Sequence, residues 1–172
     1  RDAARSGMGR MIDGGGVAVP GSTGAVARPY TSVVMLKIIG GDFRSRRLYE
    51  PGPSETSRPY LARMRESVFN LLRGWTEEAS VLDLFAGVGT VGLEAVSRGA
   101  RMAVMVEQHG RTYRALTGNI EMLGCEDRAK AVRGDALSPL VLREAEAPVD
   151  LVFLDPPYLM MQSAESRQRV LD

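Results

Sequence analysis

Apolar positions follow two different periods in the part of the chain after residue 80. Short apolar runs rich in β-branched residues alternate with segments in which apolar positions recur every three or four residues. The runs predict buried strands and the segments predict helices. The predicted strands are 81–85, 102–106, 129–132 and 149–154, and the predicted helices are 90–98, 111–123 and 139–145. Continuous apolar strands separated by helices are typical of a parallel sheet covered on both faces, so the sequence predicts an α/β fold.

The pattern before residue 75 predicts a basic arm followed by one helix. Residues 33–39 are apolar and predict a strand, a Gly-Gly pair predicts a turn, and residues 43–48 predict a basic strand or hairpin arm. Pro59 suits the first turn of a helix, where its missing N–H costs nothing. Apolar residues at helical spacing then predict a helix that buries one face and ends at Gly74. That face consists of Leu61, Met64, Val68, Leu71 and Leu72.

The first 34 residues are rich in glycine and show no sustained periodicity, which predicts a flexible leader. The chain is therefore expected to divide into a leader (1–34), an N-terminal basic arm and helix (35–74) and a core (75–172).

Composition restricts the class of protein. The chain has 172 residues, of which 44% are hydrophobic and 25% charged, as in globular proteins with a packed core. A single cysteine cannot form an internal disulfide, and no apolar run approaches the ~20 residues of a membrane span. We therefore expect a cytoplasmic protein that uses neither a membrane nor a metal.

The net charge of +1 conceals an uneven distribution of charge. Residues 37–73 carry eight basic and four acidic side chains, whereas the rest of the chain after them is acidic on balance. This difference favours a polyanionic partner that docks near the front of the chain. A solvated surface of uneven charge is the alternative.

A glycine-rich motif lies where the first predicted core strand meets a helix. Gly87, Gly89 and Gly92 match G-x-G-x-x-G, and Glu107 ends the next strand, where an acid can hold ribose hydroxyls. These features alone fit NAD as well as any other cofactor that contains adenosine. Asp83 would repel a pyrophosphate, but it suits the cationic amino-acid portion of S-adenosylmethionine.

Asp135 follows the third predicted strand, after Gly134. Its carboxylate stands where an adenine amino group can be recognised, at the carboxyl end of a strand. A solvated turn residue is the alternative interpretation.

The tetrapeptide Asp155-Pro156-Pro157-Tyr158 directly follows the strand predicted at 149–154. Its prolines stiffen the loop and remove two N–H donors, so carbonyls and the Asp155 carboxylate can accept hydrogen bonds from an exocyclic amine. Holding both N–H bonds of the amine favours its nitrogen as it attacks a methyl carbon. Tyr158 can stack on the base. A proline-rich turn that merely ends a strand is the alternative.

These motifs together resemble a known family. DLFAGVG, Glu107, Gly134-Asp135 and DPPY are similar to the motifs of class I S-adenosylmethionine-dependent amino-methyltransferases. The front segment, with KIIGG, FRSRRL, TSRP and RMRESVFN, resembles the bacterial RsmD-like family, which methylates guanine N2 in 16S small-subunit ribosomal RNA. The resemblance spans about residues 35–160. It implies a Rossmann-like sheet, S-adenosylmethionine as cofactor, and small-subunit ribosomal RNA or an assembling ribosomal particle as partner.

The resemblance also implies roles for particular residues. The implied catalytic residues are Asp155, Pro156, Pro157 and Tyr158. The implied cofactor-binding residues are Asp83, Phe85, Gly87, Gly89, Glu107, Gly134 and Asp135. The expected RNA-binding residues are Arg44, Arg46, Arg47, Arg58, Arg63 and Arg65, for which an ordinary solvated surface is the alternative. The family's sheet has seven strands, and this chain ends soon after DPPY, so we expect its sheet to be incomplete at the C-terminus.

Three other functions stay open at this point. DPPY also serves DNA adenine or cytosine amino-methyltransferases. The glycine motif also serves nucleotide-binding dehydrogenases. A truncated RNA-binding remnant without catalysis is the third.

Overall fold

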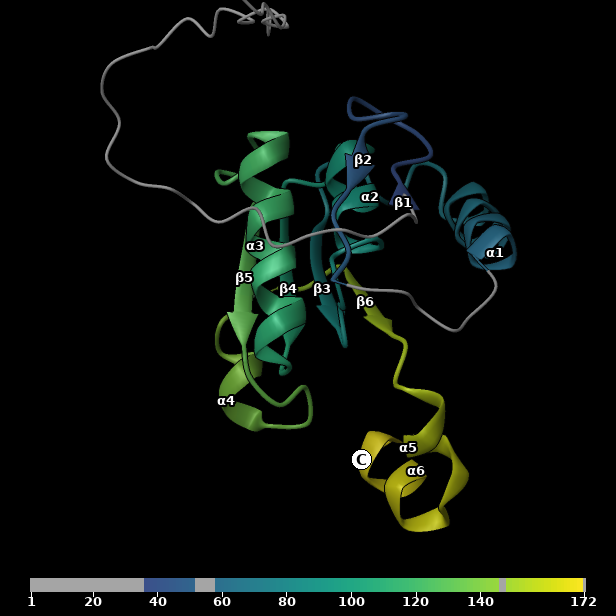
Figure 1. Cartoon of the computed structure of the whole chain (residues 1–172), viewed down its shortest axis with the longest axis vertical. Helices are drawn as coiled ribbons and strands as arrows, with labels where there is room; N and C mark the ends of the chain where they lie inside the picture. The colour runs from purple at the N-terminus through teal and green to yellow at the C-terminus, as the bar shows by residue number, and fades with distance from the viewer. Residues whose placement is uncertain (1–35, 52–57, 146–147, 172) are drawn as a thin grey trace, which may run out of the picture.

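The core of the molecule is a four-stranded parallel sheet with strand order β5-β4-β3-β6 (Figure 1). The computed structural model describes residues 36–51, 58–145 and 148–171, so the predicted leader lies outside the described residues. The strands are β3 (Ser80–Leu84), β4 (Met102–Glu107), β5 (Ala129–Arg133) and β6 (Leu151–Leu154). The predicted Rossmann-like α/β sheet is confirmed, with the four strands close to their predicted positions.

Helices connect and flank these strands. They are α1 (Arg58–Leu71), α2 (Gly92–Ser97), α3 (Gly110–Leu123), α4 (Pro139–Leu142), α5 (Tyr158–Gln162) and α6 (Ala164–Leu171). The apolar pattern did not predict α5 and α6. Gly124 ends α3 in the left-handed conformation, with φ 66°, which glycine adopts without a steric penalty. None of the helices in the described ranges is long and apolar enough to cross a membrane.

Alternate residues of β3 and β4 belong to two hydrophobic clusters, which explains why both strands are continuously apolar. Val81 and Met105 pack with residues of α2 and α3, whereas Leu82 and Val104 pack with the segment around α4. The expected cover on both faces is therefore present over β3 and β4. It is absent at β6 among the described residues, because Val152 is 57% exposed.

The N-terminal arm is a short antiparallel pair, β1 (Leu36–Lys37) and β2 (Arg47–Leu48). Residues 33–35 of the first predicted strand lie outside the described residues, and of the rest only 36–37 form a strand. The second strand is much shorter than the predicted 43–48. The reason lies in the intervening backbone, where Arg44 N–H bonds to the Gly41 carbonyl and Ser45 takes a positive φ of 68°. These turns prevent residues 41–46 from forming an extended strand.

Helix α1 buries a different face from the one predicted. Its predicted apolar face is exposed at Met64, Val68 and Leu71. The buried residues are instead Arg65 and Phe69, and the Phe69 ring centroid lies 5.7 Å from that of Phe153 on β6. The prediction was wrong because an aromatic contact and a buried arginine, rather than the aliphatic stripe, fix the rotation of the helix.

Candidate cofactor and base-binding site

The carboxyl ends of the four core strands meet at one edge of the sheet, because all four strands are parallel. Leu84, at the end of β3, pairs with Val106 on one side and with Leu154 on the other. The same edge lies at the lower end of the sheet in Figure 1, where the chain leaves β6 for α5. The four chemistry-bearing segments of the sequence therefore come together there.

The glycine loop follows β3, and neighbouring side chains pack closely against its backbone. Gly89 has φ 88°, and a Cβ at this position would lie 2.5 Å from Leu116 Cδ1 of α3. A Cβ at Gly92 would lie 2.5 Å from the Met105 side chain. Phe85 also has a positive φ, 66°, which costs a residue with a side chain about 1–3 kcal/mol. The loop is thus held in a conformation that brings bare backbone to the edge of the sheet.

Asp83 lies beneath this loop and is 2% exposed. Its Oδ2 accepts a hydrogen bond of 2.9 Å from the Gly92 N–H. Burial raises the pKa of Asp83 to about 7, the Gly92 bond opposes this rise, and the nearby Asp155 charge adds to it. Asp83 pairs with Phe153 of β6, and Asp155 follows two residues later, so the two predicted carboxylates lie near the same end of neighbouring strands. A cationic ligand at this point would stabilise the ionised form of Asp83.

Glu107 ends β4 and is also buried, with 8% exposure. Its Oε1 accepts a hydrogen bond of 2.6 Å from the His109 N–H and lies 3.2 Å from His109 Nδ1. These contacts orient the carboxylate before any ligand binds. The His109 side chain itself is 70% exposed.

The residues after β5 form a turn beside Glu107. Gly134 N–H bonds to the Glu107 carbonyl at 3.3 Å, and Asp135 Oδ1 accepts a bond of 3.0 Å from Leu137 N–H. Asp135 is exposed, so its carboxylate is accessible while it also accepts this turn hydrogen bond. Among the residues that the structure describes, no three His, Cys, Asp or Glu side chains are grouped as metal ligands.

The tetrapeptide after β6 is open to solvent. Asp155 is exposed, and Tyr158, the first residue of α5, is 79% exposed. Pro157 has φ −53° and ψ 138°, so the chain is extended just before α5. The two prolines leave this stretch with acceptors and no N–H of their own. The loop thus presents acceptor groups beside the edge that carries Asp83.

A family model described as "Conserved hypothetical protein 95" matches residues 36–171. The chain belongs to this RsmD-like family. It is 38% identical over 123 residues to "Ribosomal RNA small subunit methyltransferase D" of Escherichia coli K12, covering 72% of this chain and 60% of that protein. It is 32% identical over 124 residues to "Putative rRNA methyltransferase YlbH" of Bacillus subtilis 168, covering 72% and 67%.

Solved structures show the same fold. The "Putative methyltransferase yhhF" from Escherichia coli aligns with TM-score 0.64 and 34% identity over 81% of this chain and 73% of that chain. A hypothetical protein of Thermus thermophilus aligns with TM-score 0.63 and 33% identity over 79% and 77%. The chain spans only about 60% of the length of the Escherichia coli relative named above.

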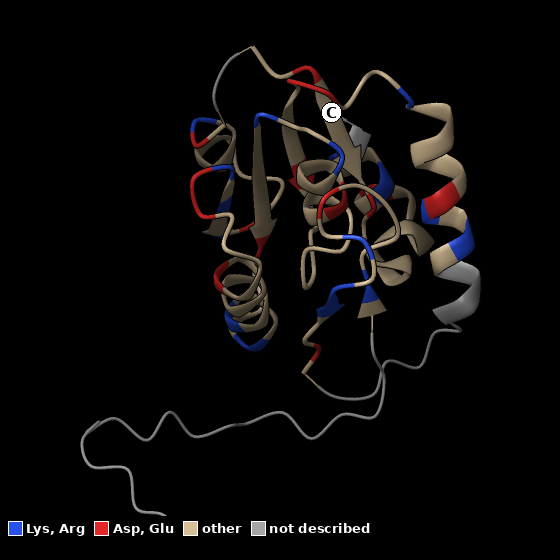
Figure 2. Cartoon of the chain, turned by 90° about the horizontal axis from the view of Figure 1, so that it is seen from above, with Lys and Arg blue, Asp and Glu red and all other residues tan. Residues whose placement is uncertain are grey.

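The arginines expected to bind RNA are not gathered at this edge of the RsmD-like chain. Figure 2 shows basic residues spread over several elements. Arg65 does not project freely as predicted, because it is 9% exposed and donates a hydrogen bond of 2.7 Å to the Lys37 carbonyl. Its burial beside Glu94, at 3.8 Å, contradicts an RNA-facing position.

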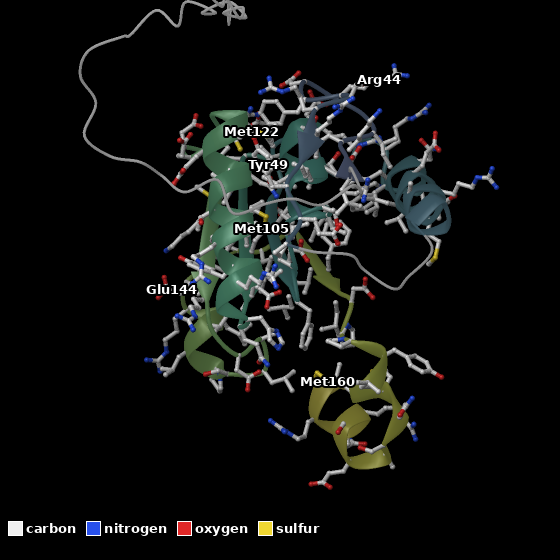
Figure 3. The ribbon with its side chains drawn as sticks, viewed as in Figure 1. Arg44, Tyr49, Met105, Met122, Glu144 and Met160 are labelled. Atoms are coloured by element: carbon white, nitrogen blue, oxygen red, sulfur yellow. The ribbon has the colours of Figure 1, made fainter. Side chains whose placement is uncertain are left out.

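The turn of the arm carries Arg44 to the end of the molecule opposite α5 (Figure 3). Asp42 N–H bonds to the carbonyl of Ser97, which ends α2, and Arg46 donates to the Met122 carbonyl near the end of α3. Both helices end at the amino edge of the sheet, because helices in this fold run antiparallel to its strands. Arg47 and Arg63 are exposed, and Arg58 begins α1.

Two residues important for this geometry were missed by the sequence analysis. Glu94 on α2 and Asn119 on α3 are both 0% exposed and hydrogen-bonded to the arm. The available signal was a polar residue on a helix face that is otherwise apolar. Their partners in the arm could not be inferred, because those partners lie more than fifty residues away in the sequence.

Proposed function

We propose that this chain carries the cofactor and base-binding parts of an enzyme that methylates the exocyclic N2 amine of a guanine in small-subunit ribosomal RNA. S-adenosylmethionine is the proposed methyl donor. One observation carries the proposal: the buried carboxylate of Asp83 lies on β3, and the acceptor loop at Asp155 directly follows β6, the neighbouring parallel strand in which Phe153 pairs with Asp83. Family membership and the names of the relatives support it.

The residues at the edge fit S-adenosylmethionine better than a dinucleotide. Asp83 offers a carboxylate to the α-ammonium group, where a pyrophosphate would be repelled. Glu107, already oriented by His109, offers its carboxylate to the ribose hydroxyls. Gly87 and Gly89 let the loop backbone approach the ligand. Phe85, Gly134 and Asp135 complete the proposed cofactor-binding set.

S-adenosylmethionine supplies a methyl group attached to a positively charged sulfur. In the proposed reaction Asp155 and the Pro156 carbonyl accept the two N–H bonds of the guanine amine, and Tyr158 stacks on the base. The loop, stiffened by Pro157, would hold the amine nitrogen in place as the nucleophile. Bound S-adenosylmethionine would supply the methyl group, with the S–C bond broken as the C–N bond forms and its electrons left on sulfur. The nitrogen then loses a proton to Asp155 or to water.

The proposed RNA surface keeps the arginines expected from the sequence, except for the buried Arg65. Its members are Arg44, Arg46, Arg47, Arg58 and Arg63. Phosphate contacts of this kind make affinity fall as salt rises. Because Arg44 lies at the far end of the molecule from the Asp155 loop, this surface would engage RNA well beyond the target base.

Methyl transfer tests the proposal directly. The full chain is incubated with S-adenosylmethionine carrying a labelled methyl group and with small-subunit particles that lack the modification, the same RNA stripped of protein, or duplex DNA. We expect label in the particle or the free RNA, recovered as N2-methylguanosine. Asp155→Ala should lower the rate about 10²–10³-fold, as for loss of one preorganised transition-state contact. The control Glu165→Ala, an exposed acid on α6, should not.

Each other outcome favours an alternative. Label in DNA alone would indicate a DNA amino-methyltransferase, and NAD binding without S-adenosylmethionine binding would indicate a dehydrogenase. Cofactor binding with no transfer to any substrate would indicate an RNA-binding remnant. Any of the three would contradict the proposed function.

A further inference from the structure

Asn119 joins the N-terminal arm to the glycine loop through one buried side chain. Its Oδ1 accepts a hydrogen bond of 2.7 Å from Tyr49 N–H. Its Nδ2 donates to the Tyr49 carbonyl at 3.1 Å and to the Val88 carbonyl at 2.9 Å. Both amide hydrogens and one acceptor position are therefore used, which is a nearly complete set for an asparagine.

The position of Asn119 makes these three bonds interdependent. The side chain is 0% exposed, so a lost partner would leave a buried polar group without a hydrogen bond, which is unfavourable. Val88 lies between Gly87 and Gly89 in the glycine loop. Leu116, one turn earlier on α3, packs against Gly89 in the same loop. Helix α3 thus supports the loop at two successive residues.

The arm is also hydrogen-bonded to α2, the helix that follows the glycine loop. Glu94, on α2, accepts hydrogen bonds of 2.7 Å from Ile39 N–H and 2.8 Å from Gly40 N–H. The arm is therefore tied to both helices that flank the glycine loop. Of these described hydrogen bonds to the arm, those of Asn119 come from a side chain that also bonds to the loop, so a shift of Tyr49 must either break the Asn119 bonds or move Val88.

We propose that Asn119 is a positioning residue that fixes the glycine loop and the arm as one unit, so that cofactor binding and arm position are coupled. This inference rests on the proposed function, because it takes S-adenosylmethionine or its demethylated product as the ligand of the loop. Asn119 touches no reacting atom and acts through the Val88 carbonyl. Its loss would let the loop relax, which would weaken cofactor binding and release Tyr49.

The matched test compares Asn119→Ala with Ile120→Ala in the full chain. Ile120 is the next residue of α3, is 4% exposed and makes a cavity when truncated, but its aliphatic side chain cannot hydrogen-bond to Val88 or Tyr49. S-adenosylhomocysteine is titrated by calorimetry at a temperature where circular dichroism shows all proteins folded. We expect Asn119→Ala to raise Kd about tenfold, the factor that corresponds to one buried hydrogen bond. Ile120→Ala should change Kd less than twofold. Equal changes in the two variants would overturn the inference.

A second measurement needs no variant. Hydrogen exchange of the Tyr49 amide is followed in the unsubstituted chain with and without saturating S-adenosylhomocysteine. We expect the ligand to slow exchange at Tyr49, and unchanged exchange would overturn the coupling. If the unsubstituted chain binds no S-adenosylhomocysteine at all, the proposed function fails. If it binds and the Asn119→Ala protein binds equally well, only this inference fails.

Discussion

The two halves of the candidate site are built differently. Around the glycine loop, every residue of β3 and of α2 is buried, and the polar side chains Asp83, Glu94 and Asn119 each have hydrogen-bond partners. Around the base-binding loop, β6 alternates between half-buried and exposed residues, and α5 has no buried residue. The proposed cofactor half is therefore closely packed, whereas the proposed base half has few packed neighbours among the described residues of this chain.

The proposed cofactor half also contains two energetically unfavourable features. Asp83 is a carboxylate held away from water, and Phe85 has a backbone conformation disfavoured for a residue with a side chain. Such features persist only where the surrounding structure enforces them, and they are concentrated at functional sites. Their position beside the glycine loop is what the proposed cofactor role leads us to expect.

The largest loss of stability is expected in the proposed cofactor half, on substitution of Glu94. In Glu94→Ala the amides of Ile39 and Gly40 and the guanidinium of Arg98 lose a buried carboxylate. Removing one partner of a buried ion pair typically costs about 3–5 kcal/mol, so the free energy of unfolding should fall by that amount in urea titrations. The control Glu66→Ala, an exposed acid on α1, should change it by less than about 0.5 kcal/mol. Similar losses in both proteins would contradict a tightly joined arm.

A pH-dependent effect is expected at Asp83. Its pKa is raised from 3.8 to about 7, so the folded protein binds a proton that the unfolded chain has already lost in this range. Asp83 therefore makes stability fall as pH rises from about 4 to about 7, with no further change above, by at most about 4 kcal/mol. Asp83→Asn keeps an oxygen for the Gly92 N–H and should remove this slope. Urea titrations at pH 5 and pH 8 measure the difference, and an unchanged slope in the variant would refute the assignment.

The smallest loss of stability is expected in the proposed base half. A matched pair of valines, one on β4 and one on β6, tests this expectation. Val104 and Val152 flank Leu82 on the two neighbouring strands, and they are 1% and 57% exposed. Val104→Thr buries a hydroxyl and should cost about 1–3 kcal/mol, whereas Val152→Thr should cost less than about 0.5 kcal/mol. Thermal unfolding of the two variants gives the comparison. Equal costs would mean that β6 is covered in solution.

Local periodicity was sufficient to predict where the core strands lie in the sequence. The signal was clear because β3 and β4 are apolar on both faces. It failed for α1, where the aliphatic stripe at Met64 and Val68 is exposed and Phe69 packs on Phe153. A stripe shows that a helix has an apolar face, but it does not identify what covers that face.

The same limit applies to charged and polar residues. Arg65 was predicted to project freely, but Glu94 and the Lys37 carbonyl bury it. Asp83 and Asp155 lie near the same end of the sheet, because parallel strands bring their carboxyl ends to one edge whatever their side chains. Asn119 could not be assigned a role from the sequence, since its partner Tyr49 is 70 residues away.

Amide chemical-shift mapping with S-adenosylhomocysteine tests most directly whether the carboxyl edge binds the cofactor. We predict that saturating ligand shifts amide resonances in residues 84–92, 107–110 and 134–137, with smaller shifts at 154–159 beside them. Shifts concentrated at the turn around Arg44, or no shifts under conditions in which NAD produces them, would contradict the account.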